Sequence, residues 1–143
     1  MTHPPPAGFE HFDVEADVGV HAWGPTRSEA FAQAALGVFA LIVPPGEVLP
    51  RETREVRAQG DSLETLLVNW INECLYLHEI EGFVVHRIAP VRCDERLVHG
   101  VLHGEAVDVG RHHLGTVVKG ATFHELEVRE REGLHEVRII VDV

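Results

Sequence analysis

The sequence predicts an α+β fold in which two helices pack on a mostly antiparallel β-sheet layer. Two segments place apolar residues three and four positions apart, which is the spacing of an amphipathic helix. Shorter segments alternate apolar and polar residues as strands do, and those after the second helix follow one another through short turns. Strands and helices in this order suit a sheet layer that is covered by helices.

The first strand signal lies at residues 12–14 and is followed by an alternating stretch that reaches Trp23. The aliphatic residues of this stretch share one face: Val18, Val20 and Ala22. Asp17 therefore points away from the aliphatic face. Gly24 and Pro25 end the strand, because proline has no backbone N–H to donate to a ladder.

The first helix is predicted to begin at Thr26 and Glu29, which have the spacing of a capping box. In such a box the hydroxyl and the carboxylate accept hydrogen bonds from free N–H groups of the first turn. The apolar residues that follow form one face for packing on the sheet: Phe31, Ala34, Ala35, Val38, Phe39 and Ile42. Two prolines and a glycine at residues 44–46 end the helix.

A charged segment at residues 51–58 predicts an edge strand, since exposed edges commonly carry charged side chains. Asp61 or Ser62 then caps the second helix. Its apolar stripe is broad and is the strongest helical signal in the chain: Leu63, Leu66, Leu67, Trp70, Ile71, Cys74, Leu75 and His78. The helix is expected to stop by Gly82.

The pattern of the remaining residues predicts β-structure. A long hairpin is predicted from Phe83 to Leu102, with its turn at residues 93–96. A loop at residues 108–115 leads to a strand at 116–130, and residues 131–133 turn the chain into the last strand. Alternation in the last strand gives two faces: Val137, Ile139, Val141 and Val143 on one, Arg138, Ile140 and Asp142 on the other.

Length and composition indicate one domain with a real core. The chain has 143 residues, a mass of 15.9 kDa and a hydrophobic content of 45%. Residues 1–8 are rich in proline and predict a disordered tail, which leaves residues 9–143 as the single domain. Cys74 and Cys93 are the only cysteines, so we expect reduced thiols rather than a disulfide framework or a cysteine-rich zinc site.

The charge balance restricts the partners of the chain. Lys and Arg number 12 against 23 Asp and Glu, so the formal net charge is 12 − 23 = −11. Direct electrostatic binding to nucleic acid or to an anionic membrane is therefore disfavoured, and a protein or cationic partner fits better. No apolar run approaches the roughly 18–20 residues of a membrane helix, and the first residues lack the features of a signal peptide. The expected compartment is the cytoplasm.

Two carboxylates form a candidate metal site. Asp17 begins the early strand and Asp142 lies one residue before the end, both on the face that is not aliphatic. If the two strands end at the same rim of the sheet, these side chains and the terminal carboxylate of Val143 supply hard oxygen ligands for calcium or magnesium. The alternative is two solvated acids at strand ends.

The histidines offer a weaker metal hypothesis. The chain has 11 of them, and the candidate ligands are His99, His103, His112, His113 and His124. A separation of four residues aligns His99 and His103 on a helix but only loosely on a strand, and no His-Glu-x-x-His pattern occurs. Scattered surface or hydrogen-bonding histidines are the favoured interpretation.

Lys119 is the third candidate, because basic residues are sparse and it lies between Val118 and Gly120 in a segment predicted as a strand. Beside carboxylates it could tune their charge or contact a phosphate, and otherwise it is simply solvated. Ser28 and Ser62 look like helix-start residues, and neither a Gly-x-Ser-x-Gly motif nor a glycine-rich phosphate loop is present. An independent enzyme is therefore not expected.

The chain resembles the archeases, small proteins that assist the RtcB-type RNA ligase. The matching segments run in order from about Phe9 to the end of the chain. They are Ala16-Asp17-Val18-Gly19-Val20, the helix at 29–41 with its Ala-Ala-Leu centre, the stretch from Leu66-Leu67 to Asn72-Glu73-Cys74-Leu75-Tyr76-Leu77, Glu81-Gly82-Phe83, the stretch from Arg111-His112 to Val128, and Asp142-Val143.

This resemblance implies an archease-like α+β sandwich that acts as a non-catalytic cofactor. It implies that the protein promotes guanylylation and multiple turnover of the ligase in tRNA splicing or RNA repair, meeting RNA only through that partner and not a membrane. Carried over residue by residue, Asp17 and Asp142 form an acidic metal-binding tip, with Val143 helping to hold a calcium-like divalent ion. Lys119 is then the functional basic residue.

The chain departs from the family pattern at four positions. The family commonly has His-Thr where this chain has Val14 and Glu15, so any role of that histidine is lost or moved. Alternation places Glu15 on the face of Asp17, where it could add an oxygen ligand. Family members also tend to have Ala at the position of Gly120 and Tyr at the position of Phe123.

Two other classes of function remain open. A free-standing metal-dependent hydrolase or nuclease could use the same carboxylates to activate water, although the sequence offers no general base and no phosphate cradle. A chaperone-like interaction module also fits a chain without a catalytic constellation.

Overall fold

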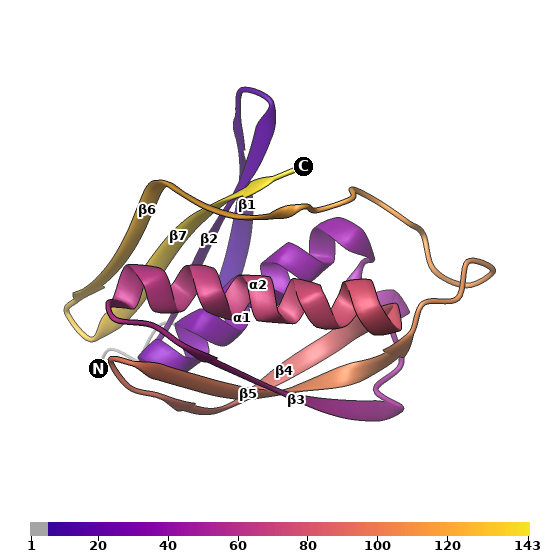
Figure 1. The fold of residues 1–143 in the computed structure, drawn as a ribbon, viewed down its shortest axis with the longest axis horizontal. Helices are drawn as coiled ribbons and strands as arrows, with labels where there is room; N and C mark the ends of the chain where they lie inside the picture. The colour runs from indigo at the N-terminus through magenta and orange to yellow at the C-terminus, as the bar shows by residue number, and fades with distance from the viewer. Residues whose placement is uncertain (1–5) are drawn as a thin grey trace.

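The structure is a computed structural model that describes residues 6–143. It contains two α-helices and seven strands, and all strand pairs are antiparallel (Figure 1). In chain order the elements are β1 (Gly8–Val14), β2 (Asp17–Gly24), α1 (Arg27–Ile42), β3 (Glu52–Gln59), α2 (Leu63–Glu81), β4 (Phe83–Cys93), β5 (Leu97–Ala106), β6 (Gly120–Arg131) and β7 (Leu134–Asp142). The predicted tail falls mostly on residues 1–5, which lie outside the described residues, and β1 already begins at Gly8.

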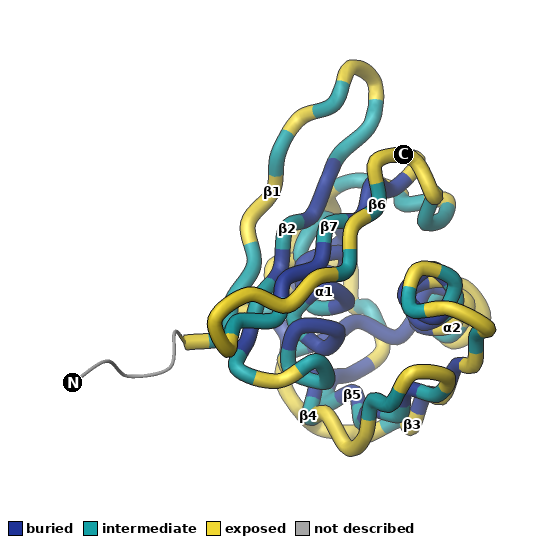
Figure 2. Tube along the Cα trace, turned by 90° about the vertical axis from the view of Figure 1, so that its left-hand side faces the viewer, coloured by how far each residue is buried: buried dark blue, intermediate teal, exposed yellow. Residues whose placement is uncertain are grey.

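The strands form two sheets rather than one layer. The first has the order β1-β2-β7-β6 and the second the order β3-β5-β4, so β3 is an edge strand as predicted. Helix α1 contacts β2 and β7 of the first sheet and β4 of the second, while α2 contacts β6 and β3 (Figures 1 and 2). The predicted fold class is confirmed, with the helices between two sheets.

Small residues explain how α1 fits between the sheets. Its buried residues include Ala30, Ala32, Ala34 and Ala35, and a Cβ atom on Gly37 would lie 2.6 Å from Val20 of β2. Such side chains let the helix backbone approach a sheet closely on more than one side. The core around α1 then fills with Phe31, Phe39, Trp70 and Phe83, all buried. None of the described helices is long and apolar enough to cross a membrane.

Both helices begin and end where their capping residues predict. The hydroxyl of Thr26 accepts the N–H of Glu29 at 3.1 Å, and the hydroxyl of Ser62 accepts the N–H of Thr65 at 3.1 Å. Of the two candidate caps for α2, Ser62 is therefore the one used. Gly82 ends α2 in the left-handed conformation, with φ of 65°, which only glycine adopts without strain.

The N-terminal strands correct the first part of the sequence interpretation. Residues 8–14 form a complete strand paired with β2, where we predicted a short signal continuing into one alternating stretch. Glu15 and Ala16 form the two-residue turn of this hairpin, and Glu15 has a φ of 47°. The prediction that Glu15 shares the face of Asp17 is therefore wrong. Neither residue is typical of such turns, so local sequence gave no signal.

The segment before β6 is a second correction. We predicted a strand at residues 116–130, but β6 begins at Gly120. The N–H groups of Gly115 and Thr116 instead bind the last carbonyls of α1, Ile42 O at 2.8 Å and Leu41 O at 2.7 Å. These carbonyls have no partner within the helix, so the segment is drawn away from the sheet to satisfy them.

Strand β6 also carries a wide bulge. Thr122 lies opposite Ile140 and Glu127 opposite Arg138, so residues 123–126 face a single residue of β7. Glu125 adopts a φ of 50° within this bulge. Bulges of this kind bend a strand and redirect its side chains, and here Phe123 and His124 become exposed.

Candidate functional site

The first sheet brings the two predicted aspartates to the same rim. Strands β2 and β7 pair through Gly19 with Ile140 and then Val18 with Val141, and Asp17 and Asp142 are each the next residue beyond that last pair. Since side chains alternate along a strand, Asp17 shares the face of Gly19 and Asp142 shares the face of its partner Ile140. Figure 1 shows the C-terminal end of the chain beside the β1–β2 hairpin. We call Asp17, Asp142 and Val143 the acidic rim.

Lys119 lies on the other flank of Asp142. It precedes β6 rather than lying within a strand, and its N–H donates to the carbonyl of Asp142 at 2.7 Å. Gly120 then pairs with Asp142 in the sheet. The single lysine of the chain is therefore held at the acidic rim by its own backbone, while its side chain is exposed.

The side chains of the rim do not by themselves complete a metal site. Within residues 6–143 there is no group of three or more His, Cys, Asp or Glu side chains placed to hold an ion. The rim supplies two carboxylates and, at Val143, main-chain oxygens. Oxygen ligands of this kind suit calcium or magnesium, which accept carboxylate, carbonyl and water ligands together.

An aromatic contact on the same face of the sheet lies next to the acidic rim. Phe12 of β1 lies over Gly19 of β2 so closely that a Cβ atom on Gly19 would be 2.0 Å from its ring. The guanidinium of Arg138 on β7 stacks on the same ring, 4.1 Å from its centroid. These three residues occupy the face that carries Asp17 and Asp142, and they tie the projecting hairpin to β7. The sequence interpretation missed them, because their contacts cross three strands.

The bulge of β6 is fastened to the same face. Arg138 lies 3.7 Å from the carboxylate of Glu125, and the hydroxyl of Thr122 donates to the carbonyl of Ile140 at 3.1 Å. Ile140 is 1% exposed although it points away from the main core. The bulge and the hairpin therefore cover Ile140 and give the sheet a second, smaller apolar centre beneath the rim.

The candidate histidines are scattered among separate partners. His99 bonds Glu55 at 2.8 Å, His113 bonds Glu47 at 2.7 Å, and His124 lies 3.8 Å from Glu125. Burial, together with the charge of Arg87, lowers the pKa of His103. His112 is buried and bonds Glu105 at 3.0 Å. The structure thus agrees with hydrogen-bonding histidines, with none of the five gathered into a metal site in the described part of the chain.

A buried charged cluster around Glu105 was not predicted. Its side chain is 5% exposed and accepts hydrogen bonds from Arg111 at 2.6 Å, the N–H of Leu49 at 2.8 Å and His112 at 3.0 Å. Burial raises the pKa of Glu105, but these donors outweigh it and hold that pKa at about 2. Alternation along β5 alone would place this glutamate on an open sheet face, so only the covering loops reveal it.

The cluster sets the course of the chain towards Lys119. Nδ1 of His112 accepts the N–H of Asp108 at 2.9 Å, so Nε2 carries the proton and donates to Glu105. The loop from Asp108 is thereby closed on β5, and the chain leaves it in a defined direction. Glu105 is thus a structural acid that anchors the approach to the rim.

The two cysteines are unpaired, and burial raises the pKa of both thiols. Cys74 is fully buried in α2, and burial raises the pKa of its thiol well above the ordinary value. Burial likewise raises the pKa of Cys93 to about 11. Thiols with such pKa values remain protonated near neutral pH, in agreement with the expected reduced state.

Comparison with known proteins decides the family. A family model described as the archease protein family (MTH1598/TM1083) matches residues 9–143. The chain belongs to the archease family. The match covers both sheets almost entirely, including every residue of the acidic rim and Lys119.

Curated archeases from distant organisms match over nearly the whole chain. The protein from Saccharolobus islandicus is 38% identical over 136 residues, covering 94% of this chain and 98% of its own length. That from Sulfurisphaera tokodaii is 34% identical over 137 residues with the same coverage, and that from Danio rerio is 31% identical over 138 residues, covering 94% and 85%.

Solved structures share the fold. The solution structure of Methanobacterium thermoautotrophicum protein 1598 superposes with a TM-score of 0.77 and 33% identity, covering 95% of this chain and 99% of that chain. The crystal structure of a Thermotoga maritima archease, described as a possible chaperone, has a TM-score of 0.60 at 18% identity and covers 92% and 94%. The second likeness extends to the fold alone.

Proposed function

We propose that this archease is a non-catalytic protein cofactor of an RtcB-type RNA ligase. In this proposal it acts in the cytoplasm and promotes guanylylation and multiple turnover of the ligase in tRNA splicing or RNA repair. It contacts RNA only through the ligase. The proposal rests on family membership together with one geometric observation: Asp17 and Asp142 both follow the last pair of β2 and β7 at one rim, and the N–H of Lys119 binds the carbonyl of Asp142.

The two carboxylates at one rim favour a bound cation. Like charges on neighbouring strands of a sheet destabilise the pairing unless a positive group lies between or beside them. No described side chain forms an ion pair with either aspartate at the rim. A divalent ion, with calcium as our first choice, would be held by Asp17, Asp142 and an oxygen of Val143 and would neutralise their charge.

The charge of the whole chain supports a protein partner. The net charge of −11 repels RNA and therefore opposes direct binding to it. The same charge attracts the basic surface of an RNA-binding enzyme. The β1–β2 hairpin projects beyond the body of the molecule, so its tip can enter a concave site on such a partner (Figure 2). Asp17 would then meet the nucleotide site of the ligase together with any ion it carries.

The test is guanylylation of the RtcB-type ligase from the same genome with GTP and limiting manganese. We expect the protein to increase the ligase–GMP product strongly, and Asp17→Asn or Asp142→Asn to reduce this stimulation at least tenfold. Asp13→Asn is the matched control, because Asp13 is an exposed residue of the same hairpin on the opposite face. Equal stimulation by both rim variants and the wild type would refute the role of the rim. Calorimetric titration with calcium measures ion binding separately.

Two alternative functions can be distinguished with the same wild-type and variant proteins. Hydrolysis of RNA or a phosphodiester by the protein alone, abolished by a chelator and by Asp17→Asn, would indicate a metal-dependent hydrolase or nuclease. Suppression of aggregation of unrelated proteins without any effect on the ligase would indicate a chaperone-like module, the description attached to the Thermotoga maritima structure.

A further inference from the structure

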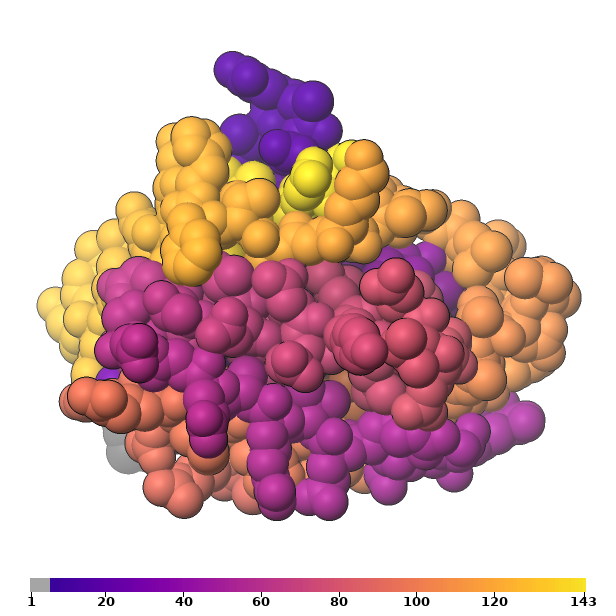
Figure 3. All heavy atoms as spheres, in the orientation of Figure 1, coloured from indigo at the N-terminus to yellow at the C-terminus, as the bar shows by residue number. Residues whose placement is uncertain are grey.

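An apolar groove lies between α2 and the segment that leads to the acidic rim. The hollow measures about 580 Å³ and is lined by Leu75 of α2, Val107, and residues 114–119, with Ile42 at the end of α1 as its floor. In Figure 3 the end of α1 is visible in this hollow, between α2 and the orange segment that passes beside it. We call this hollow the α2 groove.

The wall of the α2 groove is built rigidly. The N–H groups of Gly115 and Thr116 bind the carbonyls of Ile42 and Leu41, and the N–H of Lys119 binds the carbonyl of Asp142. A Cβ atom on Gly115 would lie 2.4 Å from the carbonyl oxygen of Leu41, so only glycine permits this approach. Because these hydrogen bonds hold the backbone of residues 115–119 at both ends, this segment cannot close over the groove unless the bonds break.

Large exposed apolar side chains lie in the wall of the groove and on the helix beside it. Val117 and Leu114 on the wall are 79% and 59% exposed, and Tyr76 and Ile80 on the neighbouring face of α2 are 56% and 66% exposed. Tyr76 and Ile80 are four residues apart and therefore adjacent on the helix surface. A cluster of exposed apolar residues beside a concavity is typical of a protein interaction site.

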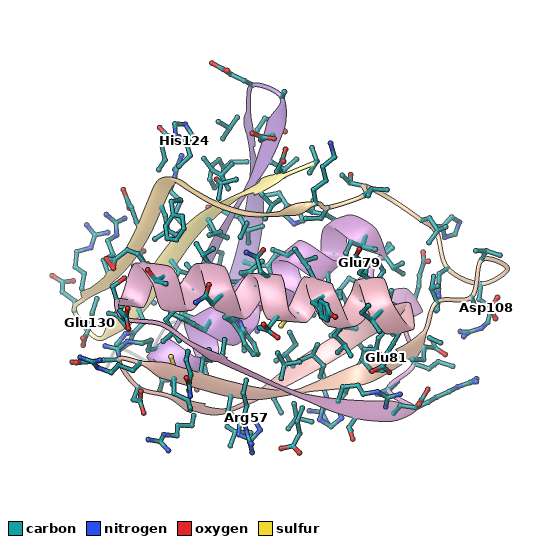
Figure 4. The ribbon with its side chains drawn as sticks, in the orientation of Figure 1. Arg57, Glu79, Glu81, Asp108, His124 and Glu130 are labelled. Carbon is teal, nitrogen blue, oxygen red and sulfur yellow. The ribbon has the colours of Figure 1, made fainter. Side chains whose placement is uncertain are left out.

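The charges at the groove indicate the chemistry of the occupant. Glu79 lines the groove from α2, whereas Glu81 lies on the opposite side of the helix and pairs with Arg54 of β3 (Figure 4). No described residue forms an ion pair with Glu79. An apolar segment that carries a Lys or Arg would bury its apolar side chains against the wall and bring its charge to Glu79 rather than to Lys119, which also lines the groove. The negative charge of the whole chain favours the same partner.

We propose that the α2 groove docks an extended apolar segment of the ligase that carries a basic residue. This inference rests on the proposed function and names a second contact for it. The groove runs to Lys119, whose backbone is joined to Asp142, so a segment seated there leads directly to the acidic rim. The groove supplies affinity, while the rim supplies the effect on guanylylation.

The two roles separate in a titration of the ligase with this protein. We expect Val117→Asp to raise the half-saturating concentration at least tenfold and to leave the maximal stimulation unchanged. Glu79→Lys should act in the same direction. Val109→Asp is the matched control, because Val109 is 78% exposed and lies outside the groove, and Glu64→Lys is the control on the first turn of the same helix. Asp142→Asn should instead lower the maximum. Urea unfolding of each variant verifies that it is folded.

The outcomes distinguish the two proposals. Direct binding of the ligase by the wild type, without stimulation, would overturn the proposed function but not the docking groove. Binding that is unchanged in both Val117→Asp and Glu79→Lys would overturn the docking groove alone. Absence of binding by the wild type would overturn both. A wild-type dimer in sedimentation that becomes monomeric in Val117→Asp would assign the groove to a second copy of this chain instead.

Discussion

The contact between Phe12 and Gly19 provides a sharp test of how the hairpin is held. A Cβ atom added at Gly19 would lie 2.0 Å from the Phe12 ring, far inside van der Waals contact. Forcing extra volume into such a contact typically costs about 1–3 kcal/mol. Alanine recovers about 0.5–1 kcal/mol of this, since glycine weakens a strand interior. We therefore expect Gly19→Ala to lower the free energy of unfolding by about 1 kcal/mol.

The second arm of the test removes the ring. In a Phe12→Ala background the clash is absent, so Gly19→Ala should raise the free energy of unfolding by about 0.5–1 kcal/mol. The coupling between the two sites is then about 2 kcal/mol, well above the few tenths expected for independent residues. Urea unfolding of the wild type, both single variants and the double variant measures it. If Gly19→Ala costs the same with and without Phe12, the ring does not hold the hairpin as described.

Two further predictions concern the buried polar contacts. Glu105→Gln removes a buried carboxylate that pairs with Arg111 and accepts a hydrogen bond from His112, and it should cost about 3 kcal/mol at pH 7. Because the folded pKa of Glu105 is about 2 against an ordinary 4.5, the contribution of its charge is complete above about pH 4.5 and is lost as the pH falls. The urea midpoints of variant and wild type should therefore converge towards pH 2. Trp70→Phe removes the hydrogen bond from the indole to the carbonyl of Phe31 and leaves space above Gly100, so thermal unfolding should show a loss of about 2 kcal/mol, whereas a loss near zero would contradict the packing described.

Local signals in the sequence were sufficient for the helices. Thr26 and Ser62 cap them, Gly82 ends α2, and the apolar stripes coincide with the buried faces. These features act within a few residues along the chain, so periodicity and capping chemistry report them directly. The hairpin of β4 and β5 and the turn before β7 were equally readable, since each joins strands that are neighbours in sequence.

Contacts between residues far apart in the sequence explain the two elements that the sequence predicted wrongly, the segment before β6 and the β1–β2 hairpin. The segment before β6 has the composition of a strand, yet its N–H groups bind the end of α1, which is about 70 residues earlier in the chain. The hairpin of β1 and β2 closes through Glu15 and Ala16, which carry no turn signal, and its closure depends on Phe12 resting on Gly19. The conformation of such segments depends on the surface against which they pack and not on the intrinsic propensity of their residues.

The sequence alone determined the helices, the strand faces and the candidate residues Asp17, Asp142 and Lys119, because alternation and rarity of charge are properties of the chain itself. Only the tertiary structure decided that Asp17 and Asp142 lie at one rim, since the register of β2 and β7 brings the neighbouring residues Val18 and Val141 together. The same is true of Glu105, which becomes a buried anion only when two loops close over an otherwise open strand. Burial and register depend on which distant segments pack against each other, and a local sequence pattern does not specify that packing.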